Sequence, residues 1–124
     1  MLKHLLTLFA LLFCNTLFAQ EFITRWKLSN TGSSPNGITF KIQTTGPVNY
    51  TWETVPVGSS GSGTFNGNIA NVTGLPTGAI IKLKIDSANF KQIKIANGAD
   101  RLRLINIEQW GSVQWGNLDS AFYG

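Results

Sequence analysis

The feature that most constrains this chain is a strict alternation of apolar and polar residues in several short segments. In segment 80–85, which reads IIKLKI, Ile81, Leu83 and Ile85 share one face and the two lysines share the other. Successive side chains of a β-strand point to opposite sides, so a period of two indicates a strand with one buried face. Because such segments recur between turns rich in glycine and proline, the sequence predicts an all-β sandwich.

Other strand segments carry the same kind of pattern, and they are residues 22–28, 38–44, 50–55, 69–73, 90–95 and 101–107. The residues expected to face the core in the first two are Phe22, Thr24, Trp26 and Leu28, then Ile38, Phe40 and Ile42. Segment 58–63, which reads GSSGSG, is interpreted as a flexible loop. A phosphate-binding loop would need a following helix and usually a lysine, and neither is predicted there.

The beginning of the chain has the pattern of a secretory signal. Lys3 and His4 precede an apolar run over residues 5–13, and Ala19 offers a small residue for cleavage. The run is too short to span a membrane, and no later run reaches 18 apolar residues. We therefore predict that residues 1–19 are a signal peptide, that the protein is secreted or displayed at the cell surface, and that no membrane span remains after cleavage.

Removal of these 19 of the 124 residues leaves 105 residues without histidine or cysteine, because His4 and Cys14 are the only ones. The remaining chain has no imidazole base, no thiolate nucleophile, no disulfide, and neither of the residue types that form structural zinc sites. Its six carboxylates are scattered over separate loops and strand ends, so no catalytic acid pair is predicted. We expect a protein that is not an enzyme and has no cofactor and no metal site.

The charge of the chain is mildly basic, with a formal net charge of +4 that falls to +3 without Lys3. Three basic pairs could form one positive face for an anionic partner, and they are Lys82 and Lys84, Lys91 and Lys94, and Arg101 and Arg103. Stacking aromatics are not interleaved with them, and lysines on solvated faces also discourage edge-to-edge aggregation. We interpret these pairs as solvated sheet faces and expect no nucleic-acid partner.

The last segment, residues 108–124, differs from the rest and carries two of the four tryptophans, Trp110 and Trp115. Asn117 suits the N-cap of a short helix. The apolar side of that helix would carry Leu118, Ala121 and Phe122. A helix this short needs a partner surface, as a unit of a repeat architecture does.

Several stretches resemble the N-terminal part of bacterial BspA-like surface proteins. They read EFITRW from Glu21, ITF from Ile38, NYTW from Asn49, IEQWGSVQW from Ile107, and DSAFYG from Asp119. The resemblance implies an immunoglobulin/PKD-like β-sandwich over residues 20–107. It also implies the start of a BspA-type leucine-rich repeat over residues 108–124, with the short helix in it. Family members continue with further repeats, so this chain is expected to be a truncated member.

The function implied by the resemblance is adhesion or partner binding at the cell surface, by a module that caps leucine-rich repeats and contacts an unidentified protein or glycan. Its expected interface with the following repeats consists of Trp110, Trp115, Leu118 and Phe122. The alternative is a carbohydrate-binding module of an exported protein, with Tyr50, Trp115 and Tyr123 as possible ligand contacts. Aromatics clustered at the C-terminal edge would favour the capping module, and a line of exposed aromatics would favour the carbohydrate-binding one.

Overall fold

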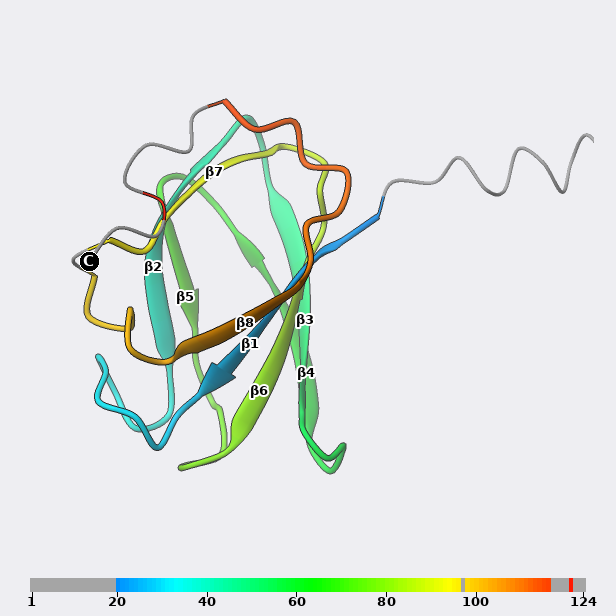
Figure 1. Cartoon of the computed structure of the whole chain (residues 1–124). Coiled ribbons are helices and arrows are strands. Elements are labelled where there is room, and N and C mark those ends of the chain that lie inside the picture. The colour runs from blue at the N-terminus through cyan, green and yellow to red at the C-terminus, as the bar shows by residue number, and fades with distance from the viewer. Residues whose placement is uncertain (1–19, 97, 117–120, 122–124) are drawn as a thin grey trace, which may run out of the picture.

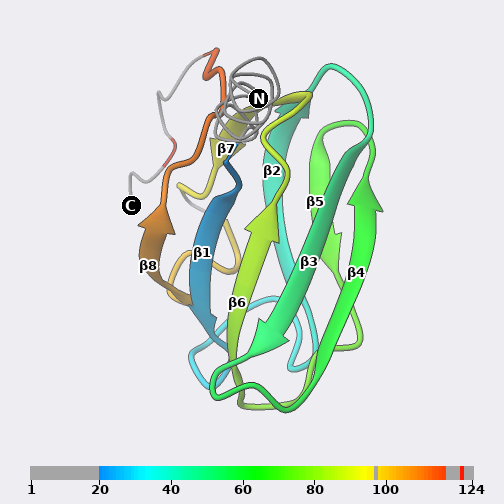
Figure 2. The same ribbon diagram turned by 90° about the vertical axis from the view of Figure 1, so that its right-hand side faces the viewer.

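The computed structural model describes residues 20–96, 98–116 and 121. Within them the chain forms eight strands in two layers (Figures 1 and 2), which are β1 (Phe22–Lys27), β2 (Ile38–Thr44), β3 (Val48–Thr54), β4 (Ser60–Phe65), β5 (Ile69–Val72), β6 (Ile80–Ile85), β7 (Phe90–Lys94) and β8 (Leu104–Gln109). The predicted all-β class and the arrangement of two stacked sheets are confirmed. No helix occurs in the described residues, and so none there is long and apolar enough to cross a membrane.

Two predicted elements lie largely outside the described residues. The signal peptide, residues 1–19, lies outside the described residues, and so does most of the predicted C-terminal helix, at 117–120 and 122–124. Both stay predictions.

The two sheets differ in size and are joined by repeated crossovers. One has five strands in the order β4-β3-β6-β1-β8, and the other has three in the order β5-β2-β7. All pairs are antiparallel, and only β3 and β4 are neighbours both in the sequence and in a sheet. Pairing between strands distant in sequence makes chain closure the slow part of folding.

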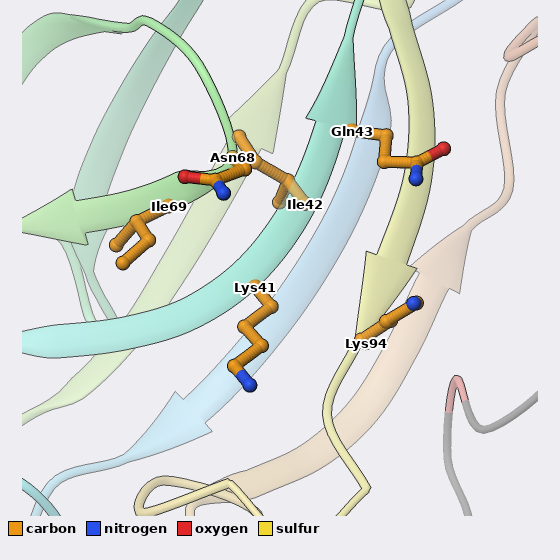
Figure 3. Close-up of a pocket in the computed structure, with 6 residues that line it drawn as sticks. All are labelled: Lys41, Ile42, Gln43, Asn68, Ile69 and Lys94. Atoms are coloured by element: carbon orange, nitrogen blue, oxygen red, sulfur yellow. The ribbon is translucent and has the colours of Figure 1, made fainter.

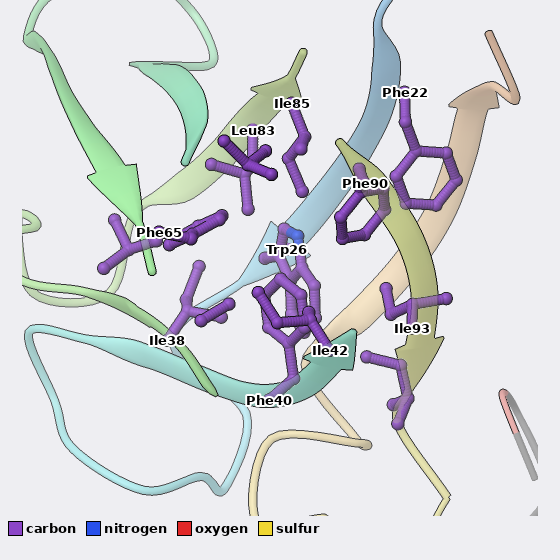
Figure 4. Close-up of a cluster of buried hydrophobic side chains, with 14 of the residues drawn as sticks. Phe22, Trp26, Ile38, Phe40, Ile42, Phe65, Leu83, Ile85, Phe90 and Ile93 are labelled. Carbon is purple, nitrogen blue, oxygen red and sulfur yellow. The ribbon is translucent and has the colours of Figure 1, made fainter. Parts of the chain in front are cut away.

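The core lies between the sheets and is formed by the apolar faces that the alternation predicts (Figure 4). Trp26 in β1 stacks on Phe40 in β2 with ring centroids 5.3 Å apart, which ties one sheet to the other. The buried indole N–H of Trp26 donates a hydrogen bond of 2.7 Å to the hydroxyl of Thr24. Thr24 therefore faces inward, as its place in the alternation predicts, because it supplies the acceptor that a buried indole needs.

The prediction of a flexible loop at 58–63 is wrong for residues 60–63, which belong to β4. Gly61 lies opposite Trp52 of β3 in the sheet, and Gly63 lies opposite Tyr50. A Cβ on Gly61 would lie 2.5 Å from Nε1 of Trp52, and one on Gly63 would collide with the Tyr50 ring. The glycines therefore serve as space for two aromatic rings that cover the edge strand, which is a recognised use of glycine in strands.

The predicted strand 101–107 is also displaced, since β8 spans Leu104–Gln109 and residues 101–103 form a turn. The reason is Arg103, which is only 3% exposed and points into the loop between β1 and β2. Its guanidinium donates hydrogen bonds to the backbone carbonyls of Asn30, Ser34 and Gly37 and pairs with Asp100 at 3.2 Å. A strand through Arg103 would give up these bonds.

The idea of one positive face is wrong, because the three basic pairs lie in different places. Lys82 and Lys84 lie on the outer face of the large sheet, and Lys91 and Lys94 belong to the small sheet. On the large sheet, Glu108 pairs with Arg25 and with Lys82, the latter at 3.2 Å, and Lys84 pairs with Glu53 at 3.3 Å. Lys82 and Lys84 thus lie on a solvated face, as interpreted from the sequence, but they are also held in ion pairs there.

These ion pairs make the stability of the sandwich depend on pH through Glu108. Burial alone would raise the pKa of Glu108, but hydrogen bonds from Lys82 and Arg25 and their charges outweigh burial and hold the pKa below its ordinary value. A carboxyl with a lower pKa in the folded state stabilises the fold above its unfolded pKa of about 4.3, and this contribution is lost as the pH falls through the folded pKa.

We expect Glu108→Gln to lower the free energy of unfolding by up to about 1 kcal/mol at neutral pH, since the pair is partly exposed. The difference from the wild type should shrink as the pH falls from about 4.3 through the lower pKa of the folded state, where the wild type also loses the charge. Urea unfolding at neutral and acidic pH measures both effects. The control is Glu21→Gln, because Glu21 forms no ion pair within the described residues. A difference between Glu108→Gln and wild type that is constant over pH would contradict this account.

Candidate functional site

The two late tryptophans meet two buried phenylalanines at one end of the sandwich. Trp115 lies edge-on to Phe22 at the start of β1 and to Phe90 at the start of β7, with centroid distances of 5.3 and 5.6 Å. Trp110 lies 5.8 Å from Phe22 and 6.1 Å from Trp115. We call Phe22, Phe90, Trp110 and Trp115 the aromatic cluster. Its tilted and edge-to-face pairs are the arrangements that aromatic rings prefer.

The path of the chain after β8 brings the tryptophans to this end. Figure 1 shows the segment after β8, in orange, crossing the end of the sandwich from the large sheet toward the small one. Gly111, with a φ of +72°, makes the turn, and a Cβ at this position would collide with the carbonyls of Gln20 and Glu21. Both the positive φ and the close approach require glycine, so this residue directs the chain over the cluster.

Backbone hydrogen bonds fix the segment to both sheets. The N–H of Ser112 donates to the carbonyl of Gln20 at 3.0 Å, just before β1. On the other side, the N–H of Gly116 donates to the carbonyl of Lys91 at 2.8 Å, and the N–H of Ile95 donates to the carbonyl of Ala121 at 2.6 Å. The segment after β8 thus bridges the ends of β1 and β7, and β8 itself runs past residue 107, where the sequence predicts the end of the sandwich.

The members of the cluster differ in exposure. Phe22 and Phe90 are fully buried, Trp115 is half-buried, and Trp110 is 47% exposed although it contacts both Phe22 and Trp115. Val113, between the two tryptophans in sequence, is buried with the core. The cluster therefore has a buried base and one large apolar surface that faces outward at Trp110.

The other residues expected at a site do not join this cluster. Tyr50 stacks on Phe65 with centroids 4.2 Å apart, and burial raises the pKa of its hydroxyl. Leu118, Phe122 and Tyr123 lie outside the described residues. Of the predicted interface, the structure thus brings Trp110 and Trp115 together. Of the predicted ligand contacts, Tyr50 is half-buried and packs on Phe65, with no ring contact to Trp115 among the described residues.

Four of the five acidic side chains in the described residues have ion-pair or hydrogen-bond partners, and Glu21 is the exception. Asp100, Glu53 and Glu108 hold ion pairs, and Asp86 accepts a hydrogen bond of 3.0 Å from the N–H of Ala88 in a turn. No group of three histidine, cysteine, aspartate or glutamate residues that could hold a metal ion occurs in the described ranges. Glu21 and Asp86 line one depression together with Tyr50.

Comparison of the chain with protein-family models, with curated proteins and with solved structures yields no match.

Sequence reasoning missed Phe22 and Phe90 as members of the cluster. The alternation places Phe22 in the core, and Phe90 begins a strand segment, but neither pattern says that both rings lie at one end of the sandwich beneath Trp115. A signal was present in Gly111 between the tryptophans, since a glycine shortly after a strand predicts a turn. The direction of that turn depends on the carbonyls of residues 20–21, which no local pattern reveals.

Proposed function

We propose that this protein is an exported, non-enzymatic interaction module with an immunoglobulin/PKD-like sandwich, whose aromatic end packs against a leucine-rich repeat of the BspA type. The observation that carries the proposal is the aromatic cluster, which gathers both late tryptophans where the chain leaves the sandwich. Trp110, with 47% of its surface exposed at that end, offers apolar area that a stacked unit would bury.

The distribution of the other aromatics supports this function over a carbohydrate-binding platform. Trp26 is fully buried, Trp52 lies half-buried over Gly61, and Tyr50 stacks on Phe65. A stacking platform for sugars needs several aromatic faces in a row at the surface, and among the described tryptophans only Trp110 is largely exposed. The two late tryptophans gather at the C-terminal edge, the arrangement expected for the capping function.

The test is a fusion of residues 20–124 to an array of BspA-type leucine-rich repeats. We expect the fused sandwich to raise the melting temperature of the array by about 4 °C or more, since each kcal/mol gained shifts melting by several degrees. Trp110→Ala should remove most of the gain, because Trp110 supplies the exposed apolar area. The matched control is Val57→Ala, at a position 72% exposed and outside the cluster.

An array that melts at the same temperature with and without the sandwich would overturn the capping function. Turnover in a hydrolase screen of the purified chain would overturn the non-enzymatic part. Glycan binding that is lost in Trp115→Ala without a change in melting would favour the carbohydrate-binding alternative instead.

A further inference from the structure

The outer face of the small sheet carries positive charge that no acidic residue of its own strands balances. β2, β5 and β7 contain Lys41, Lys91 and Lys94 but no aspartate or glutamate. None of these lysines forms an ion pair within the described part of the chain, whereas Arg25, Lys82 and Lys84 of the large sheet all do. The two sheets therefore present different surfaces, because most cations of the large sheet are ion-paired, with Lys27 at the end of β1 the exception, whereas the lysines of the small sheet are not.

The register places two of these lysines directly opposite each other. Lys41 of β2 is the cross-strand partner of Lys94 of β7. On its other side, Lys41 is paired with Ile69 of β5. Like charges opposite each other on one sheet face destabilise the pairing. An anion bound between them would relieve this repulsion and would gain charge-assisted hydrogen bonds from both ammonium groups.

Three depressions lie along β2 on this face, and neighbouring depressions share lining residues. The middle one, of about 210 Å³, is drawn in Figure 3 and contains Lys41, Lys94, Gln43 and Asn68. It shares Lys41 and Lys94 with a second of about 300 Å³, and it shares Gln43 and Asn68 with a third of about 330 Å³ that includes Lys91. We call this continuous surface the lysine track, and between Thr39 and Thr45 it is about 20 Å long.

We propose that the lysine track binds a linear acidic polysaccharide. A track of this length suits an extended chain, and its three lysines supply positive charge at the middle and at one end. The side-chain amides of Gln43 and Asn68 form no hydrogen bond within the described residues. They are suited to bind sugar hydroxyls, because each amide has both donors and an acceptor. No tryptophan or tyrosine lines the three depressions. Phe40 lines one of them, but it is only 5% exposed and its ring stacks on Trp26, so the bases of a single-stranded nucleic acid would find no free aromatic face.

This inference goes beyond the capping function and does not depend on it. The lysine track lies on the outer face of the small sheet and shares no residue with the aromatic cluster. A failure of capping is measured by the melting of the fusion, and a failure of polysaccharide binding is measured by titration of the unfused chain.

The experiment measures binding of the purified chain to polygalacturonate, which carries one carboxylate per sugar, with neutral dextran and a single-stranded oligothymidylate as comparisons. We expect binding to polygalacturonate that weakens strongly as salt is raised, because exposed charges are screened, and no binding to dextran. Lys94→Glu should weaken binding about tenfold or more, since it replaces the attraction between the lysine ammonium group and a sugar carboxylate by a repulsion between two carboxylates.

The control variant is Lys27→Glu, which makes the same change of charge at an exposed lysine of the large sheet. It should change the affinity by less than about twofold, because a distant exposed charge is screened. Lys94→Glu should melt no lower than the wild type, since Lys41 then faces an opposite charge, so loss of binding would not reflect unfolding. Equal losses in the two variants, no binding to polygalacturonate, or equally tight binding of the oligothymidylate would overturn the proposal.

Discussion

Ile81→Asp is expected to leave the domain unfolded at 25 °C. Ile81 is fully buried in β6, where it lies between Trp26 of β1 and Thr54 of β3 in the large sheet. The substitution loses roughly 1.5–3 kcal/mol of apolar burial. It also places a carboxylate in the core, which must stay protonated or draw in water at a cost of several kcal/mol more. Together these terms rival the whole stability of about 5–15 kcal/mol that domains have.

The same substitution at Ile105 provides the matched control. Ile105 is 46% exposed and lies at a bulge of β8, where the register with β1 shifts between Arg25 and Trp26. Ile105→Asp should change the free energy of unfolding by less than about 1 kcal/mol, and so should Lys82→Ser, which removes only a partly exposed ion pair. Far-UV circular dichroism and urea unfolding measure all three variants. Comparable losses for Ile81→Asp and Ile105→Asp would contradict the assignment of faces.

The contrast between Ile81 and Ile105 also explains which parts of the fold the sequence predicts. In β1, β2 and β6 the alternation is unbroken, so a period of two gives both the strand and its buried face. In β8 two bulges interrupt the register, and a bulge moves every later residue to the opposite face. Bulges depend on the partner strand, so the pattern of β8 alone places its beginning and its faces poorly.

The predictions for the Gly-rich strand and for the buried arginine are wrong for a related reason. Gly61 and Gly63 read as loop residues because glycine lowers strand propensity, yet the rings of Trp52 and Tyr50 fill the space above them. Arg103 reads as a surface cation, yet the carbonyls and the carboxylate that bind it come from segments up to 73 residues away. In the aromatic cluster, Trp110 and Trp115 were predictable as an apolar pair, but not the phenylalanines beneath them. Each of these features is a pairing across the sequence that composition and period do not encode.

The buried pair of Asp100 and Arg103 is the long-range feature with the largest expected effect on stability. Oδ1 of Asp100 accepts a hydrogen bond from the N–H of Ser33 at 2.8 Å, and Oδ2 accepts one from the N–H of Thr39 at 2.6 Å. The side chains of Asp100 and Arg103 are only 1% and 4% exposed. Asp100 therefore holds the loop between β1 and β2 from one side while Arg103 holds it from the other. A Cβ on Gly32 would collide with both, which shows how closely the loop is wrapped around the pair.

Asp100→Ala should lower the free energy of unfolding by about 3–5 kcal/mol, because it leaves a buried guanidinium without its carboxylate and two backbone donors without acceptors. Adding Arg103→Met removes the unpaired charge, so the double variant should be more stable than the sum of the two single losses. Guanidinium unfolding of the four proteins gives this coupling, and limited proteolysis of residues 29–37 reports on the loop. Strictly additive losses, or a loss below about 1 kcal/mol for Asp100→Ala, would mean that the pair fills space without holding the loop. A positive coupling together with faster cleavage in Asp100→Ala would place the anchor of the loop in the pair itself, because this variant keeps the Arg103 guanidinium that binds the carbonyls of Asn30, Ser34 and Gly37.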